Sequence, residues 1–263
     1  MLHRVSLRPV TELEISNVID NLKKNAAPGH DGICVNNLLL FKKKLLPVLV
    51  KLINTAFQTG IYPDVLKISR VIPIFKAGEH NKIHNYRPIS LISNISKIFE
   101  IIIKNRLVEF VSKYVGRDPY QYGFVENSGT LCATTDFVNY ISSELDKGNF
   151  VVAIYIDLQK AFDVVDHSVL LDKLEKMGVR GVALSLLKTY LSNRRQYVTL
   201  NSADSAMLFN AAGVPQGSVL GPLLYTLHVL SLKNIKLSCK YFSFADDTVL
   251  VFVISLRTYS RTP

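Results

Sequence analysis

Apolar residues recur along the chain at two spacings, one typical of amphipathic helices and one typical of strands. Thr11 and Glu14 form a capping-box pattern, and the apolar positions after them predict a short helix that ends near Lys23 and Lys24. A new element is expected over residues 33–40. The helical spacing predicts further helices over residues 45–57, 95–114, 131–145, 170–177 and 182–191.

Continuous apolar and β-branched runs predict strands between these helices. The run 69–76, followed by the turn residues 77–79, predicts a hairpin with cationic tips. The run 150–158 predicts a core strand that is buried on both faces and carries Asp157 at its end. Residues 241–253 predict a hairpin around the pair Asp246 and Asp247.

The composition is that of a globular protein. With 48% hydrophobic residues, 13 Gly and 10 Pro in 263 residues, the collagen-like and linker-like classes are excluded. The longest apolar stretches are too short to cross a membrane, and the first residues lack the apolar core of a secretory signal. We therefore expect no membrane partner and an intracellular location, in the nucleus or the cytoplasm.

The net charge of +10 favours a polyanionic partner such as nucleic acid, although charge alone leaves an acidic membrane surface open. Basic residues that could line a phosphate track are Lys42, Lys43, Lys44, Lys104, Arg106, Arg194 and Arg195. The three cysteines, Cys34, Cys132 and Cys239, form no Cys-x-x-Cys pair, which argues against a zinc site and a disulfide framework. They are expected to be buried thiols.

Two acidic points stand in strongly apolar surroundings: Asp157, and the pair Asp246 and Asp247. They lie 89 residues apart in the sequence (246 − 157). Carboxylates brought close together repel each other, and a divalent cation such as Mg²⁺ with its preference for oxygen ligands would resolve that conflict. The alternative is that the Asp-Asp pair only forms a hairpin turn, where Asp is favoured for local hydrogen bonding.

Eight short segments distinguish between these two interpretations, because they occur along the chain in the same order as in one known family. They are Ala26-Ala27-Pro28-Gly29-His30-Asp31-Gly32-Ile33, Val71-Ile72-Pro73-Ile74-Phe75-Lys76, Asn85-Tyr86-Arg87-Pro88-Ile89-Ser90-Leu91, Gln121-Tyr122-Gly123-Phe124, Ile156-Asp157-Leu158-Gln159-Lys160-Ala161-Phe162-Asp163, Tyr190-Leu191-Ser192-Asn193-Arg194-Arg195-Gln196, Gly213-Val214-Pro215-Gln216-Gly217-Ser218-Val219-Leu220-Gly221-Pro222 and Phe244-Ala245-Asp246-Asp247-Thr248. Over residues 22–251 the chain resembles the reverse transcriptase domain of non-LTR (LINE-type) retrotransposons.

This resemblance implies an α+β fold, that of a right-hand polymerase with fingers and palm. Residues 1–149 would form the fingers and an N-terminal extension, and residues 150–254 a partial palm with an antiparallel sheet packed on helices. Residues 255–263 do not look like the family's continuation, so we expect an aberrant or disordered tail and a chain that is truncated before the thumb.

The resemblance also implies a role for particular residues. Asp157, Asp246 and Asp247 would be the catalytic carboxylates and the ligands of two Mg²⁺ ions, with Mn²⁺ as a substitute. The residues expected to bind the nucleotide are Lys76 and Arg87 on the triphosphate, Phe162 under the sugar, and Gln216 with Gly217 near the base. The partners would be an RNA template, a DNA primer and deoxynucleoside triphosphates.

Plainer interpretations of these residues stay open at this point. Lys76 and Arg87 could be a solvated hairpin tip, Phe162 could be core, and the loop at Gln216 could be an ordinary turn. His167 is expected to begin a helix rather than to take part in catalysis.

The predicted function is that of an RNA-directed DNA polymerase with a two-metal mechanism. One alternative is an inactive truncated remnant that only binds nucleic acid. A weaker alternative is a metal nuclease, against which Phe162 and Gln216 argue because strand hydrolysis needs no sugar selection.

Overall fold

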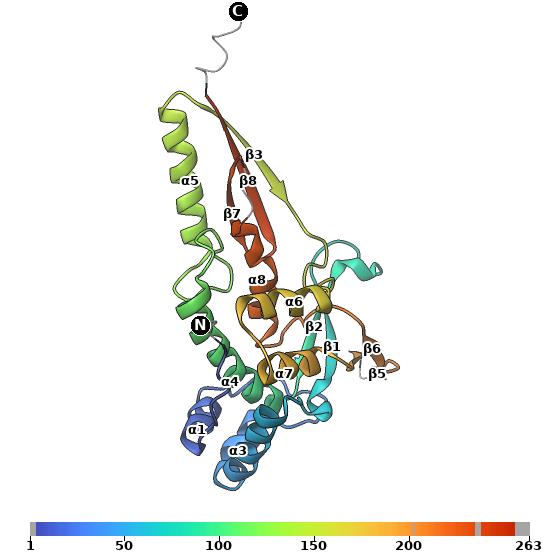
Figure 1. Cartoon of the computed structure of the whole chain (residues 1–263). Helices are drawn as coiled ribbons and strands as arrows, with labels where there is room; N and C mark the ends of the chain where they lie inside the picture. The colour runs from blue at the N-terminus through green and yellow to red at the C-terminus, as the bar shows by residue number, and fades with distance from the viewer. Residues whose placement is uncertain (1–3, 202, 235–237, 256–263) are drawn as a thin grey trace, which may run out of the picture. The chain divides into compact units, whose positions relative to one another are not determined.

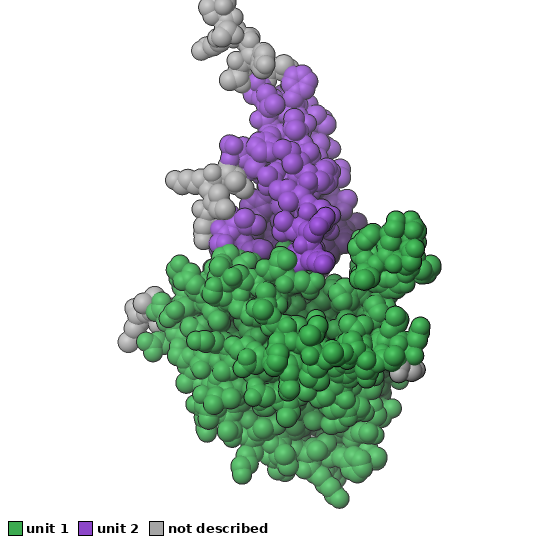
Figure 2. Space-filling model, turned by 90° about the vertical axis from the view of Figure 1, so that its right-hand side faces the viewer, with its two compact units in different colours: residues 1–115, 162–228 green, residues 116–161, 229–263 purple. Residues whose placement is uncertain are grey.

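The computed structural model describes residues 4–201, 203–234 and 238–255. The chain forms two compact units, each built from two segments: unit 1 comprises residues 1–115 and 162–228, and unit 2 comprises residues 116–161 and 229–263 (Figure 2). The predicted boundary between residues 149 and 150 falls inside unit 2, so the units divide the chain differently from the predicted fingers and palm. The predicted tail 255–263 lies, apart from Ser255, outside the described residues.

Unit 1 combines helices with a mixed sheet (Figure 1). Its helices are α1 (Glu12–Asp20), α2 (Val35–Leu40), α3 (Lys42–Thr59), α4 (Asn94–Phe110), α6 (His167–Met177), α7 (Val182–Leu191) and α8 (Gly221–Val229), the last residue of which belongs to unit 2. Shorter turns are η1 (Asp64–Lys67), η2 (Ile83–Asn85) and the π-helical turn η3 (Val111–Val115).

The sheet of unit 1 joins strands from both of its chain segments. The strands are β1 (Ile68–Phe75), β2 (Tyr86–Ile92), β4 (Arg194–Leu200), β5 (Ala203–Asp204) and β6 (Leu208–Asn210). Their order is β2-β1-β4-β5, with β6 also paired to β4. The β1–β2 hairpin is antiparallel, whereas β4 pairs with β1 in the parallel sense.

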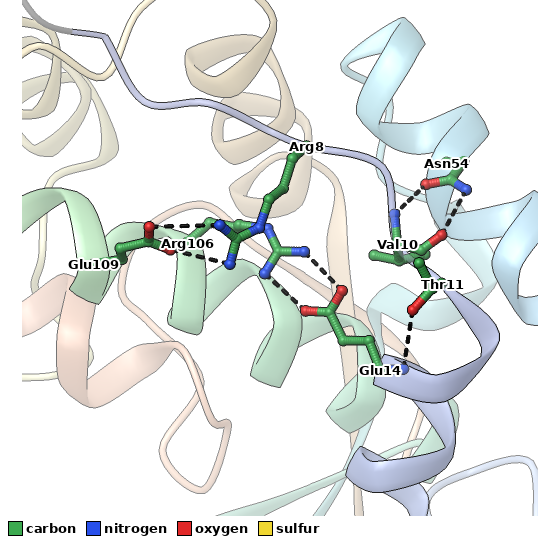
Figure 3. Close-up of polar contacts among 7 residues, drawn as sticks. All are labelled: Arg8, Val10, Thr11, Glu14, Asn54, Arg106 and Glu109. Carbon is green, nitrogen blue, oxygen red and sulfur yellow. Dashed lines mark hydrogen bonds and ion pairs between the residues drawn. The ribbon is translucent and has the colours of Figure 1, made fainter.

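The N-terminal segment of unit 1 is held by polar contacts to α3 and α4 (Figure 3). Thr11 Oγ1 accepts a hydrogen bond from the backbone N–H of Glu14 at 3.2 Å, which confirms the predicted cap. The Arg106 guanidinium donates to both carboxylate oxygens of Glu14, at 2.7 and 2.8 Å. Asn54 exchanges two hydrogen bonds with the backbone of Val10. The helix that Thr11 caps ends at Asp20, earlier than expected, so the predicted lysines lie beyond it.

Unit 2 is a three-stranded sheet with one long helix on it. The strands β3 (Phe150–Ile156), β8 (Asp247–Ile254) and β7 (Lys240–Phe244) lie in the order β3-β8-β7 and pair only in the antiparallel sense. Helix α5 (Thr130–Asp146) contributes Phe137 and Tyr140, whose rings contact Phe242 at centroid distances of 5.5 and 5.9 Å. The remaining element of this unit is the 3₁₀ turn η4 (Leu230–Asn234). Helices and sheets combine as the predicted α+β class requires.

The prediction that the strand 150–158 is buried on both faces is wrong. Val152, Ile154 and Ile156 are 47%, 48% and 37% exposed, and they share one face because side chains alternate along a strand. The opposite face carries Val151, which packs with the cluster around Phe242. The continuous apolar run therefore corresponds to a strand of a sheet that α5 covers on one face only.

Two predictions about polar and thiol side chains are also wrong. Cys132 is exposed, because it lies on α5, which has no fully buried residue. Cys34 and Cys239 are half-buried free thiols. Arg106 and Arg194 are 4% and 1% exposed, so neither lies on an open phosphate track. Among the described residues, no helix has the length and apolar content of a membrane span.

Candidate active site

Asp157 and the Asp246–Asp247 pair come to the same end of the unit 2 sheet. Antiparallel pairing of β3 with β8 sets Ile156 opposite Thr248. Asp157 directly follows Ile156, and Asp247 directly precedes Thr248. The two acidic points, distant in sequence, therefore share one edge of one sheet.

A two-residue turn of Ala245 and Asp246 joins β7 to β8. Phe244 pairs with Asp247 at the base of this turn, which confirms the predicted hairpin around the acidic pair. Ala245 has a φ of 60°, a left-handed conformation that costs a residue with a side chain about 1–2 kcal/mol. Asp246 is half-buried and Asp247 is exposed, so both carboxylates are accessible to a ligand.

The donor chemistry of this sheet end suits a hard divalent cation, because Mg²⁺ prefers carboxylate oxygens. In the part of the chain that the structure describes, no group of three His, Cys, Asp or Glu side chains lies close enough together to hold a metal ion. The backbone places Asp157, Asp246 and Asp247 at one end of the unit 2 sheet, and these are the residues that would hold such an ion.

The turn is held by a residue to which the sequence analysis gave no role. Gln121 Oε1 accepts hydrogen bonds from the backbone N–H groups of Ala245 and Gly123, at 2.9 and 2.8 Å. The sequence signal was the Gln-Tyr-Gly-Phe segment, which marks the position but does not show the contact with a turn more than a hundred residues later.

The loop that carries Gln216 and Gly217 lies in unit 1 and is fixed to two neighbouring segments. The backbone N–H of Ser90 in β2 donates to the carbonyl of Gln216 at 2.8 Å. At the other end of the loop, Val214 N–H donates to the carbonyl of Phe162 at 2.8 Å. The loop is thereby joined both to the strand that carries Arg87 and to the segment that carries Phe162.

Phe162 is half-buried and stacks on Tyr225 of α8, with ring centroids 4.7 Å apart and an interplanar angle of 25°. Phe162 is thus partly packed, as the alternative interpretation of this residue as part of the core expected. The ring also retains exposed surface, and a bulky side chain held in place by stacking is suited to limiting the space beside a bound sugar.

Lys76 and Arg87 are exposed at the β1–β2 hairpin, as its predicted cationic character requires. Arg87 pairs with Ile74 across the hairpin, and the backbone N–H of Lys76 donates to the carbonyl of Asn85 at 2.8 Å. The two cations therefore belong to one hairpin and are available to an anionic ligand.

Glu100 is a second residue that the sequence analysis missed. It is fully buried in α4, where Oε2 accepts hydrogen bonds from the N–H groups of Val219 and Leu220 at 2.7 and 3.0 Å. Its other oxygen accepts from the Tyr190 hydroxyl at 3.1 Å. Burial raises the pKa of the Glu100 carboxyl, against the opposing effect of the Arg194 guanidinium. Glu100 thus anchors the chain just beyond the loop of Gln216 and Gly217.

His167 begins helix α6, as expected. Asp166 caps this helix by accepting a hydrogen bond from the N–H of Val169 at 2.9 Å. The His167 Nε2 atom lies 2.7 Å from the carbonyl oxygen of Gly213. This contact is a further link between the α6 start and the loop 213–217.

The structure therefore gathers the predicted residues into two groups, one in each unit. The carboxylates of Asp157, Asp246 and Asp247 share the end of the unit 2 sheet. Unit 1 holds the residues expected at the nucleotide, which are Lys76, Arg87, Phe162, Gln216 and Gly217.

Comparison with known proteins adds a family to this geometry. The family model described as reverse transcriptase (RNA-dependent DNA polymerase) matches residues 74–256. The matched range includes both groups of candidate site residues.

Three of the similar proteins come from mobile elements of Drosophila. The chain is 32% identical over 227 residues to the probable RNA-directed DNA polymerase from transposon BS of Drosophila melanogaster, covering 86% of this chain and 25% of that protein. It is 32% identical over 229 residues to the RNA-directed DNA polymerase from mobile element jockey of Drosophila funebris, again covering 86% and 25%. With the probable RNA-directed DNA polymerase from transposon X-element of Drosophila melanogaster it shares 33% identity over 251 residues, 94% of this chain and 28% of the relative. The chain thus spans about a quarter of the length of these relatives.

Proposed function

The chain belongs to the reverse transcriptase family, and from that premise we propose that it is the polymerase domain of a non-LTR retrotransposon, which adds deoxynucleotides to a primer 3′-hydroxyl on an RNA template. The observation that carries the proposal is the pairing register of β3, β8 and β7, which brings three carboxylates to one sheet end. Residues 150–254, which include the strands β3, β7 and β8, would form the palm, and residues 1–149 would include the fingers.

Asp157, Asp246 and Asp247 would hold two Mg²⁺ ions, for which Mn²⁺ is a substitute. When bound, the ions supply positive charge next to the primer hydroxyl and the triphosphate, as in other phosphoryl-transfer enzymes. The protein's own contribution is to hold the backbone positions from which the three side chains extend. Asp157 directly follows β3, Asp246 lies in the β7–β8 turn, and Asp247 is the first residue of β8.

The residues of unit 1 would select and hold the nucleotide. Lys76 and Arg87 provide charge-assisted hydrogen-bond donors for a triphosphate. Phe162, held by its stacking on Tyr225, would exclude a ribose 2′-hydroxyl. Gln216 has a side-chain amide that can donate and accept hydrogen bonds, and the absence of a side chain at Gly217 permits close approach of the backbone.

Primer extension on poly(rA)/oligo(dT) with Mg²⁺ tests this proposal. We expect the 263-residue chain to extend the primer and Asp246→Asn to reduce the rate by about 10³-fold or more, since several kcal/mol of charge stabilisation would be lost. Asp146→Asn is the matched control, because it makes the same change at an exposed position of the same unit. The proposal fails if the chain does not extend the primer, or if the two variants behave alike.

A further inference from the structure

We propose that Gln121 is a positioning residue for the catalytic carboxylates, because its side chain holds the Ala245–Asp246 turn in a backbone conformation that alanine does not favour. The inference rests on the proposed function, since it concerns the carboxylates assigned there to metal binding. It concerns unit 2 alone, to which Gln121 and the turn both belong.

The Gln121 amide makes three hydrogen bonds in a buried setting. Besides accepting from the N–H groups of Ala245 and Gly123, it donates through Nε2 to the carbonyl of Ala245 at 3.3 Å. Gln121 is 8% exposed. Both backbone polar groups of Ala245 are therefore bound by one side chain. The amide orientation is set by its partners, because a reversed amide would direct its NH₂ group at two N–H donors.

Ala245 occupies the position where a tight turn normally has glycine. In two-residue hairpin turns the first central residue often has a positive φ, for which Gly is preferred. Ala245 has a φ of 60° at that place and is 9% exposed. A conformation that the residue does not favour persists only when its surroundings determine it. The hydrogen bonds of Gln121 to both backbone polar groups of Ala245 can do so, in addition to the pairing of Phe244 with Asp247 at the base of the turn.

The segment that carries Gln121 is itself aligned against β7. The Tyr122 N–H donates to the carbonyl of Ser243, and the Ser243 N–H donates to the carbonyl of Tyr120, each at 2.8 Å. At Gly123, a Cβ atom would lie only 2.1 Å from the backbone nitrogen of Ala245. The approach of this segment to the turn therefore requires glycine at position 123.

Asp246 follows Ala245 directly, and Gln121 binds the carbonyl of the peptide group that joins them. The position of this peptide group therefore determines the position from which the Asp246 side chain extends. Catalysis is sensitive to displacements of about 1 Å in a reacting group. An amide suits this position better than a carboxylate would. Glutamate could not donate to the Ala245 carbonyl when ionised, and it would add a negative charge beside two aspartates.

The test compares Gln121→Met, which keeps the length of the side chain and removes its hydrogen bonds, with Gln58→Met, the same change at an exposed position of α3. Two measurements are made on the 263-residue chain: steady-state extension on poly(rA)/oligo(dT), and hydrogen exchange of the Ala245 and Gly123 amides. Gln121→Asn, which keeps the amide but shortens its reach, is a second variant in case the first folds poorly.

For Gln121→Met we expect kcat to fall about 10- to 100-fold with KM for the nucleotide within about twofold, because binding in unit 1 is untouched. The Ala245 and Gly123 amides should exchange faster than in the wild type. Adding Ala245→Gly should restore most of kcat, since glycine adopts a positive φ without help. Gln58→Met should match the wild type in both measurements.

Unchanged exchange at Ala245 in Gln121→Met would overturn the inference. A fall in kcat that is accompanied by an equally large rise in KM would also overturn the inference. The same holds for a fall in kcat that Ala245→Gly does not reverse, because both results indicate general destabilisation. A wild-type chain that binds its substrates but does not extend the primer would overturn the proposed function instead. The exchange comparison would then still support or reject the hold of Gln121 on Ala245.

Discussion

Glu100 shows how much one buried side chain can organise. It is fully buried, yet its carboxylate accepts hydrogen bonds from the N–H groups of Val219 and Leu220 and from the Tyr190 hydroxyl. Ser96 donates a further hydrogen bond to it at 3.3 Å. The carboxylate thus joins α4 to α7 and to the chain that enters α8, and all of these elements lie in unit 1.

Replacing Glu100 by Ala should lower the free energy of unfolding by about 3–5 kcal/mol, because several buried donors would lose their acceptor. Urea titration followed by circular dichroism measures this change. Glu109→Ala on the same helix is the control. Glu109 makes an exposed ion pair with Arg8, so its loss should cost less than about 1 kcal/mol. Equal effects of the two substitutions would refute the anchoring role.

The pKa of Glu100 is raised by burial above its ordinary value of 4.5, which gives stability a dependence on pH. Because burial raises the pKa of the folded state, the folded chain binds this proton more tightly than the unfolded chain between 4.5 and the raised value. The contribution of Glu100 to stability therefore falls as pH rises through that range and towards the raised pKa.

Glu100→Gln, which cannot ionise, isolates this effect. We expect the difference in unfolding free energy, variant minus wild type, to increase as the pH is raised from about 4.5 to 7, because only the wild type loses stability through this group. Urea titrations at several pH values measure the difference. A difference that stays constant or decreases with pH would show that the folded pKa is not raised.

At the scale of elements, Gly217 fixes the loop of Gln216 against β2. Its φ is +109°, and a Cβ atom there would lie 2.7 Å from the carbonyl oxygen of Ser90. Ser90 also donates its N–H to the carbonyl of Gln216 at 2.8 Å. The loop can approach the strand this closely only because position 217 has no side chain.

Gly217→Ala should therefore displace the loop and weaken nucleotide binding. We expect KM for the nucleotide to rise about tenfold, the effect of about 1.4 kcal/mol, and the melting temperature to fall. Steady-state extension and thermal melting measure the two effects. Gly148→Ala, with a similar positive φ but no atom within 4 Å of the added Cβ, controls for backbone strain. The role of the close approach is disproved if both variants show the same KM.

Most helices and strands could be predicted from the sequence because their signals are local. The predicted helices 95–114 and 131–145 correspond to α4 (Asn94–Phe110) and α5 (Thr130–Asp146), and the predicted strand 69–76 corresponds to β1 (Ile68–Phe75). The spacing of the apolar residues and the capping residues lie within or directly beside each segment, and they determine such elements.

Pairing between distant segments left no comparable signal. The parallel pairing of β1 with β4 joins Val71 to Val198, and nothing near either residue indicates the other. The carboxylates could be selected because charge in apolar surroundings is unusual. Gln121 and Glu100 could not be assigned a role, because their importance depends on backbone groups about 120 residues away in sequence.

At the scale of the whole molecule, the net charge of +10 is the main physical property relevant to partners. Arg106 contributes to that sum but is buried in an ion pair with Glu14, and Arg194 is buried as well. The residues left to contact phosphates are the exposed cations, including Lys76 and Arg87 of the β1–β2 hairpin.

Binding of an RNA–DNA duplex should accordingly weaken as salt rises, because each phosphate contact releases counterions. If at least six phosphates are contacted, affinity should fall by about 10³-fold between 50 and 200 mM salt. Fluorescence anisotropy with a labelled duplex measures this, with a methylphosphonate duplex as the uncharged control. A fall of less than about tenfold would refute an interface dominated by phosphate contacts.

The division of unit 1 into two chain segments has a consequence for synthesis on the ribosome. Strand β1 ends at Phe75 and its neighbour β4 begins at Arg194. At about 5–20 residues per second, the nascent β1–β2 hairpin would wait on the order of 10 s for that neighbour to emerge. During this interval the free edge of β1 could pair with a segment of another nascent chain. A chaperone that covers extended edges should therefore raise the yield of folded protein most when translation is slow between residues 76 and 194.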